Sequence, residues 1–284
     1  MGNVRKALHI CRGSFKRELV SPRIYIAFLW FLFLIYFIVS VIRSFGVSVG
    51  LRTSPWLLPL LTQQSGNQMF IIIGALLIFC DAPFLHANSG WQILRAGRKN
   101  WFWGNMLYIW GMSLFYALVL AIIPIILLIP HVATINSWGQ VLGSLAQTNA
   151  ASQLGIGNLC YDIMSQYEPI EAMILTILPI WLNSVLIGMV NYTFNLYGKN
   201  GSGAVVSIAL GLSPLMLTKL ASPRIAYYIA PPLWMNLYYY SKDGYGVGPS
   251  FGYVYGVLMG LIAVLTIFSY LGIRRKDLNM VEEI

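Results

Sequence analysis

The hydrophobic positions of this chain fall into long uninterrupted runs rather than into the alternating or stripe patterns of water-soluble folds. A helix that crosses a bilayer needs about 20 apolar residues, and six runs approach or exceed that length. They cover residues 24–42, 67–84, 105–129, 172–194, 203–220 and 251–271. The sequence therefore predicts an all-α integral membrane protein with six transmembrane helices in one domain, residues 1–284.

A second helical pattern precedes the first run. Within residues 1–22, apolar residues recur at spacings of three and four, as on one face of a helix. They are Val4, Leu8, Cys11, Phe15 and Leu19. Basic side chains project from the other faces, which is typical of a helix lying in the membrane interface. We therefore expect an N-terminal amphipathic interfacial helix that leads into the first span.

Charge sets the expected orientation. The chain has 18 Lys and Arg against 9 Asp and Glu, with 58% hydrophobic and only 10% charged residues. If the N-terminus is cytoplasmic, 13 basic residues lie inside, against five outside: Arg43, Arg52, Lys219, Arg224 and Lys242. This asymmetry follows the positive-inside rule, so both termini are expected in the cytoplasm and the chain in the plasma membrane. The basicity indicates membrane topology and contact with lipids, not nucleic acid.

Several kinds of chemistry are disfavoured. The three cysteines and three histidines are scattered, with no metal-ligand spacing. The glycine-rich stretch at residues 198–203 lacks a phosphate-loop pattern, because Thr193 stands where the first Gly belongs and Asn200 follows Lys199. The span interiors hold no ionisable residue of the kind that ion-coupled transporters use. We expect no catalytic residue, metal or bound cofactor in this chain.

Two sets of residues are candidates for packing or transport. Small residues repeat every four positions in the last two runs and favour close helix packing, in this chain or with a second copy. They are Gly203, Ser207 and Gly211, and then Gly252, Gly256 and Gly260. Mildly polar residues inside the spans either bond neighbouring helices or line a substrate path. The candidates for the path are Tyr36, Tyr116, Asn183 and Asn191.

The segment between the second and third runs carries the most specific pattern. Asn88 or Ser89 can cap a short helix, Trp91 and Leu94 are apolar positions in it, and Gly97 can end it. Trp101 and Trp103 follow and are expected at the membrane interface. An interfacial or reentrant helix without a partner explains the same pattern.

This segment, together with the architecture, resembles the permease subunits of ABC-2 type transporters. The resemblance rests on Asp81-Ala82-Pro83-Phe84, on Arg95, Gly97, Arg98, Trp101 and Gly104, on the amphipathic N-terminal helix and on six spans with both ends inside. It implies a coupling helix over residues 88–98 that docks into a separate ATPase subunit. The implied contact residues are Asp81, Asn88, Trp91, Leu94, Arg95 and Arg98.

The resemblance also implies two permeases, identical or sibling, with two ATPase subunits that bind ATP and Mg²⁺. The chain itself is then not an enzyme but the membrane path of an exporter for an amphiphilic substrate such as a peptide, antibiotic or lipid. The alternatives are an integral-membrane lipid-modifying enzyme and a membrane anchor or sensor that transports nothing.

Overall fold

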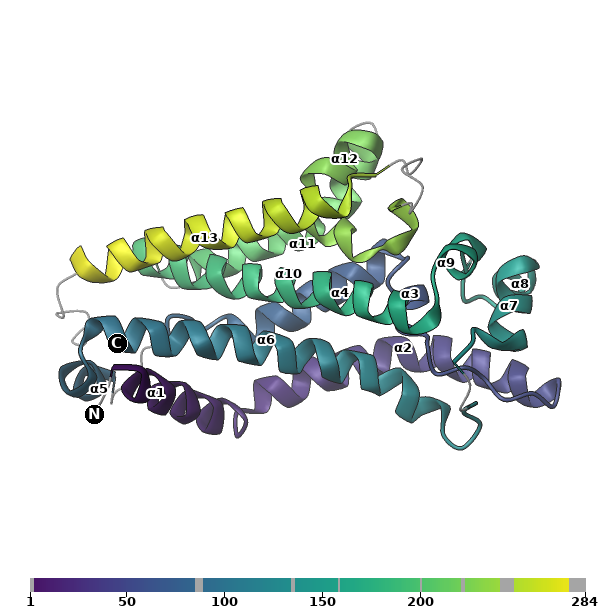
Figure 1. Cartoon of the computed structure of the whole chain (residues 1–284), viewed down its shortest axis with the longest axis horizontal. Coiled ribbons are helices and arrows are strands. Elements are labelled where there is room, and N and C mark those ends of the chain that lie inside the picture. Colours follow the sequence, from purple (N-terminus) through teal and green to yellow (C-terminus); the bar gives the residue numbers. More distant parts are fainter. Residues whose placement is uncertain are drawn as a thin grey trace.

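The computed structural model is built from helices that lie side by side along one axis (Figure 1). It describes residues 3–84, 89–133, 136–157, 159–199, 201–220, 223–240 and 248–275. Within these ranges the secondary structure is helical except for one isolated bridge, between Thr53 and Val132. The all-α prediction is confirmed.

Six long helices form the body of the molecule, and each corresponds to one of the six apolar runs. They are α2 (Pro22–Ser48), α4 (Ser65–Phe79), α6 (Arg98–Leu128), α10 (Pro169–Tyr197), α11 (Ser202–Leu220) and α13 (Phe251–Arg275). Four of them, α2, α6, α10 and α13, are long and apolar enough to cross a membrane, whereas α4 and α11 are shorter apolar helices. The chain therefore has the character of a multi-pass membrane protein.

The central helix is α10. In its most apolar window 72% of the residues are buried within the molecule, against 28% for both α2 and α13. Buried polar side chains on α10 bond backward along their own helix, as Asn183 does to the Pro179 carbonyl oxygen and Ser184 to that of Ile180. Polar groups in an apolar core need hydrogen-bond partners. The bonds to carbonyl oxygens one turn earlier in α10 supply these partners, so Asn183 and Ser184 can be buried in the core.

The two ends of the bundle differ. The short helix α5 (Ser89–Ala96), the beginning of α1 (Asn3–Glu18) and the last turn of α13 lie at one end (Figure 1). At the other end lie α3 (Leu58–Leu61), α7 (Gly139–Gln147), α8 (Ala150–Gln153) and α9 (Tyr161–Gln166). The chain between α11 and α13 adds α12 (Pro223–Ile229) and two 3₁₀ turns, η1 (Pro231–Met235) and η2 (Leu237–Tyr239).

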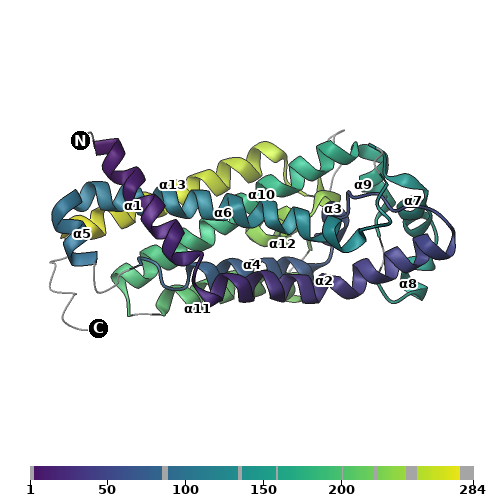
Figure 2. The same ribbon diagram turned by 90° about the horizontal axis from the view of Figure 1, so that it is seen from below.

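Helix α1 crosses the bundle obliquely (Figure 2) and packs on α6. Val4 and Leu8 of the apolar stripe are exposed on the molecule, while Ala7 and Ser14 are buried. The small residues let the two backbones approach closely. A Cβ on Gly104 of α6 would lie 2.8 Å from the Cβ of Ile10 and 3.0 Å from the Ala7 carbonyl oxygen.

Several helix ends depart from the predicted runs, and two of them lie beside α5. Helix α4 ends at Phe79, before the turns at residues 80–84, and α6 already begins at Arg98. The early start follows from Gly97, whose φ of 85° is readily adopted only by glycine. Consequently Trp101 lies one turn inside α6 and is buried within the chain, while Trp103 is 46% exposed. The place of the two residues at the membrane interface stays a prediction.

Candidate functional site

The short helix α5 lies against the start of α6 with its largest apolar side chains turned outward. Of the α5 side chains whose burial the structure describes, only Ile93 is buried, whereas Trp91 is 68% and Leu94 is 69% exposed. Arg95, in the last turn, is also exposed. Apolar side chains this exposed on a short helix give it a surface suited to a partner.

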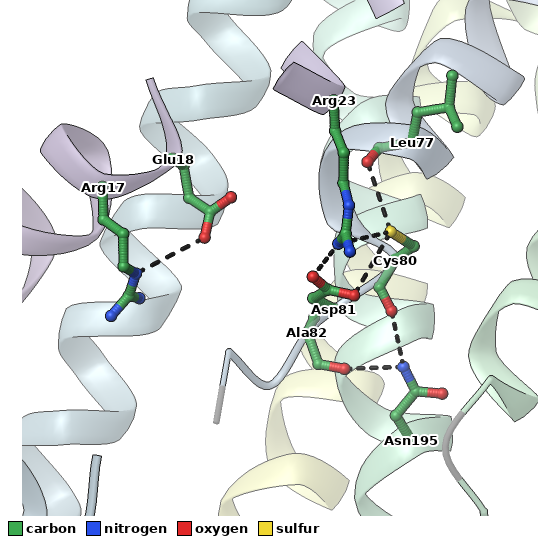
Figure 3. Close-up of polar contacts among 8 residues, drawn as sticks. All are labelled: Arg17, Glu18, Arg23, Leu77, Cys80, Asp81, Ala82 and Asn195. Carbon is green, nitrogen blue, oxygen red and sulfur yellow. Dashed lines mark hydrogen bonds and ion pairs between the residues drawn. The ribbon is translucent and has the colours of Figure 1, made fainter. Parts of the chain in front are cut away.

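Residues 80–84, which follow α4 and precede α5 in the sequence, are also fixed to the bundle. Phe84 is buried, and its ring meets the edge of Tyr108 on α6 with 5.0 Å between centroids. Asp81 is exposed but forms an ion pair with Arg23 in the first turn of α2 (Figure 3). The segment thereby joins the beginning of α2 to the end of α4.

A third attachment comes from the last turn of α10. The Asn195 amide nitrogen donates to the carbonyl oxygens of Cys80, at 3.2 Å, and Ala82, at 2.8 Å (Figure 3). Its side-chain oxygen accepts a hydrogen bond from the Gly203 backbone nitrogen at 2.8 Å. One buried amide therefore connects the ends of α4 and α10 with the beginning of α11.

No sequence motif marks Asn195 as a functional residue. Its position is the one indication of a role, because it is a polar residue in the last turn of an apolar helix and the Gly203, Ser207 and Gly211 ladder follows closely.

A second acid lies near the same helix ends. Glu18, the last residue of α1, is 3.8 Å from the Arg17 guanidinium (Figure 3). Burial raises the pKa of Glu18 above its ordinary value, and the positive charges of Arg17 and Arg23 only partly oppose this. The junction between α1 and α2 thus contains a carboxylate whose charged form is destabilised by burial.

The predicted contact residues divide into two groups. Trp91, Leu94 and Arg95 share the exposed surface of α5. Asp81 and Arg98 are engaged within the chain, since Arg98 Nη1 donates to the Arg274 carbonyl oxygen of α13 at 3.4 Å. Asn88 lies outside the described residues.

The two small-residue ladders face different surroundings. A Cβ on Gly203 would lie 2.6 Å from Asn191 Cα, Ser207 accepts a hydrogen bond from Asn191, and Gly211 faces Ile72 of α4. Within the described residues no atom lies within 4 Å of a Cβ placed on Gly252, Gly256 or Gly260. The first ladder packs inside the chain, and the second packs against nothing that the structure describes.

Three of the four predicted path residues are instead part of the packed interior. Tyr116 is fully buried and donates to the Ile71 carbonyl oxygen, and Asn183 and Asn191 bond carbonyl oxygens of their own helix. Tyr116 thereby bonds α6 to α4, and Asn191 also bonds Ser207 of α11, whereas the Asn183 bond stays within α10. Their role as path residues stays a prediction. Tyr36 differs, being 57% exposed on the outer face of α2.

Among the described residues no three His, Cys, Asp or Glu side chains form a group that could hold a metal ion.

In comparisons with known proteins, no protein-family model, no curated protein and no solved structure matches this chain.

Proposed function

We propose that this chain is the membrane subunit of an ATP-driven exporter of the ABC-2 type, with six membrane crossings and both termini on the cytoplasmic side of the plasma membrane. The observation that carries the proposal is the outward-facing pair Trp91 and Leu94 on α5, at the end of the bundle where α1 begins and α13 ends.

Six crossings require α4 and α11 to span with the four longer helices. At about 1.5 Å per residue, the 19 residues of α11 rise about 28 Å, close to the roughly 30 Å hydrocarbon core. The 15 residues of α4 rise only about 22 Å, but the buried α3 and the residues between the two helices lengthen this crossing. Both short helices pack on α10 and on each other, which supports counting them with the bundle.

The role proposed for α5 is to dock into a separate ATPase subunit. Exposed aromatic residues that become buried at the centre of an interface commonly contribute about 2 kcal/mol or more to binding, and Trp91 is such a residue. Arg95 beside it supplies a cation for charge-assisted hydrogen bonds to the partner. Two permeases and two ATPase subunits then form the transporter, and ATP and Mg²⁺ bind in the ATPases.

Attachment on both sides of α5 supports mechanical coupling. After α5, Gly97 leads directly into α6. Before it, the residue 80–84 segment is held by Arg23 of α2 and Asn195 of α10. A displacement of α5 by the ATPase therefore acts on several helices, which is what alternating exposure of a path between two permeases requires.

The substrate proposed is amphiphilic. The exposed face of α2 carries aromatic side chains, with Phe33 76%, Tyr36 57% and Phe37 57% exposed. Such a wall offers apolar contact with tyrosine hydroxyls for hydrogen bonding, which suits a peptide, antibiotic or lipid better than a bare ion.

The test is isolation of the affinity-tagged chain from its own membranes, followed by transport in reconstituted vesicles. The proposal expects an ATPase subunit to be retained and substrate movement to require ATP and to survive a protonophore. Isolation without any ATPase, or transport driven by a proton gradient alone, would contradict it.

A further inference from the structure

A small cationic cavity lies where the first turn of α6 meets the last turn of α13. It has a volume of about 270 Å³ and is lined by Arg98, Lys99, Tyr270, Ile273 and Arg274. Three of the five lining side chains are cationic, and none is a carboxylate. The volume is below the roughly 300–1,000 Å³ of pockets for drug-sized ligands, so the cavity suits a small anionic group.

The two arginines are held in place by contacts that leave donors free. Arg98 is half-buried and gives one guanidinium hydrogen to the Arg274 carbonyl oxygen at 3.4 Å. The Arg274 guanidinium lies over the Tyr270 ring, 5.2 Å from its centroid, in a cation–π arrangement. Because a guanidinium has five N–H donors, both arginines keep several for a ligand.

The first turn of α6 contributes positive potential. Arg98 and Lys99 are the first two residues of α6, where the helix dipole is positive and backbone N–H groups lack helical partners. A phosphate is the group that such donors and three cations recognise best.

Exposed apolar residues continue from the cavity along both helices. On α6, Trp103 and Leu107 follow Lys99 at intervals of four, and both are more than 40% exposed. On α13, Leu271 and Ile267 precede Arg274 by three and seven residues, so they lie on the same helix face, and both are exposed. An anion bound in the cavity therefore has apolar helix surface beside it, as a lipid headgroup with acyl chains does.

We infer that Arg98, Lys99 and Arg274 bind the headgroup phosphate of an anionic membrane lipid whose acyl chains lie along α6 and α13. This site does not depend on the proposed ATPase contact, because it is built from α6 and α13 and leaves the exposed face of α5 free. A lipid bound there bridges the start of α6, directly after α5, to the end of the last helix.

The test measures lipid retention on the full-length detergent-solubilised protein by native mass spectrometry, in titrations with phosphatidylglycerol, phosphatidylcholine and inorganic phosphate. The site variant combines Arg98→Gln, Lys99→Gln and Arg274→Gln. A matched variant, Arg5→Gln, Arg12→Gln and Lys16→Gln, removes the same charge from exposed positions of α1 at the same end of the bundle. Thermal unfolding of each variant checks that it is folded.

Removing one cation near an anionic lipid surface lowers the binding constant roughly fivefold. The site variant is therefore expected to bind phosphatidylglycerol at least tenfold more weakly, and the α1 variant within about twofold of the wild type. Phosphatidylcholine, which has the phosphate but no net charge, is expected to bind more weakly than phosphatidylglycerol. Equal losses in the two variants would overturn the inference in favour of diffuse surface charge.

Two other outcomes would also overturn it. Displacement of the lipid by inorganic phosphate at equal concentration would make the cavity a site for a small anion. Lipid binding that appears only after Asp277, Glu282 and Glu283 are neutralised would make the chain's own acidic C-terminal residues the occupant in the native protein.

Discussion

The Asn195 amide nitrogen donates to the Ala82 carbonyl oxygen over 2.8 Å, so the last turn of α10 is tied to the segment that leads from α4 toward α5. The same side chain accepts from the Gly203 nitrogen. Because the side chain is only 5% exposed, its removal leaves buried backbone groups without partners.

Asn195→Ala is therefore expected to lower the free energy of unfolding by about 1–3 kcal/mol, measured by thermal or denaturant unfolding in detergent. The matched control is Asn183→Ala. Asn183 is equally buried, but its amide is bonded only to the Pro179 carbonyl of its own helix. A loss no larger for Asn195→Ala than for Asn183→Ala would show that the three-way connection adds no stability.

The small-residue ladders predict opposite effects of the same substitution. Gly203→Ala places a Cβ 2.6 Å from Asn191 Cα, and such overpacking costs about 1–3 kcal/mol. Gly256→Ala meets open space and gains roughly 0.5–1 kcal/mol from the helix preference of alanine. Melting temperatures of the two variants should move in opposite directions.

Gly256→Leu separates two roles for the exposed ladder. If α13 meets a second permease at this face, the leucine reduces dimerisation while the monomer melts as before, measured by light scattering together with thermal unfolding. A less stable monomer would mean that Gly256 packs inside its own chain, contrary to the open space around it.

The half-buried carboxylate of Glu18 predicts a pH dependence. Its pKa is raised in the folded chain, so its protonated form favours folding and that contribution is lost as pH rises through the folded pKa. Glu18→Gln is neutral at every pH. The variant should melt above the wild type at pH 7, and the difference should shrink toward zero below about pH 4. A variant that melts below the wild type at pH 7 would mean that the ion pair with Arg17 outweighs burial.

Topology is tested with single cysteines in a chain whose own Cys11, Cys80 and Cys160 are changed to Ser. Gln153→Cys on α8 and Gly13→Cys on α1 occupy exposed positions toward opposite ends of the bundle. An impermeant thiol reagent should label Gln153→Cys in intact cells and Gly13→Cys only after permeabilisation. The reverse pattern would invert the proposed orientation.

The sequence predicted the helices well because apolar runs of membrane length leave little choice of structure. Each of the six runs overlaps one long helix, and residues 88–98 contain α5. The terminal turns were less predictable: α4 stops at Phe79 because the following residues are held by Arg23 and Asn195, which are distant in sequence.

Which face of a helix packs inward depended on tertiary contacts that the sequence does not show. On α1, the apolar periodicity marks one face of the helix, but the sequence does not show that Ala7 and Ser14 pack inward or that the Ala7 carbonyl lies close to Gly104. The ladders of α11 and α13 have the same four-residue spacing, yet only that of α11 meets another helix within the described residues. Asn195 was missed because its partners are backbone groups, which leave no residue pattern.

We propose that α5 transmits force from an ATPase through its exposed face. The most direct test is substrate-dependent ATP turnover per assembled complex in Trp91→Ala, with Tyr161→Ala as the control, since Tyr161 is also an exposed aromatic residue but lies on α9, at the opposite end of the bundle. If Trp91 is the anchor, Trp91→Ala should weaken ATPase binding by about 2 kcal/mol and lower turnover, while Tyr161→Ala retains both. Full ATPase retention and full turnover in Trp91→Ala would contradict the claim.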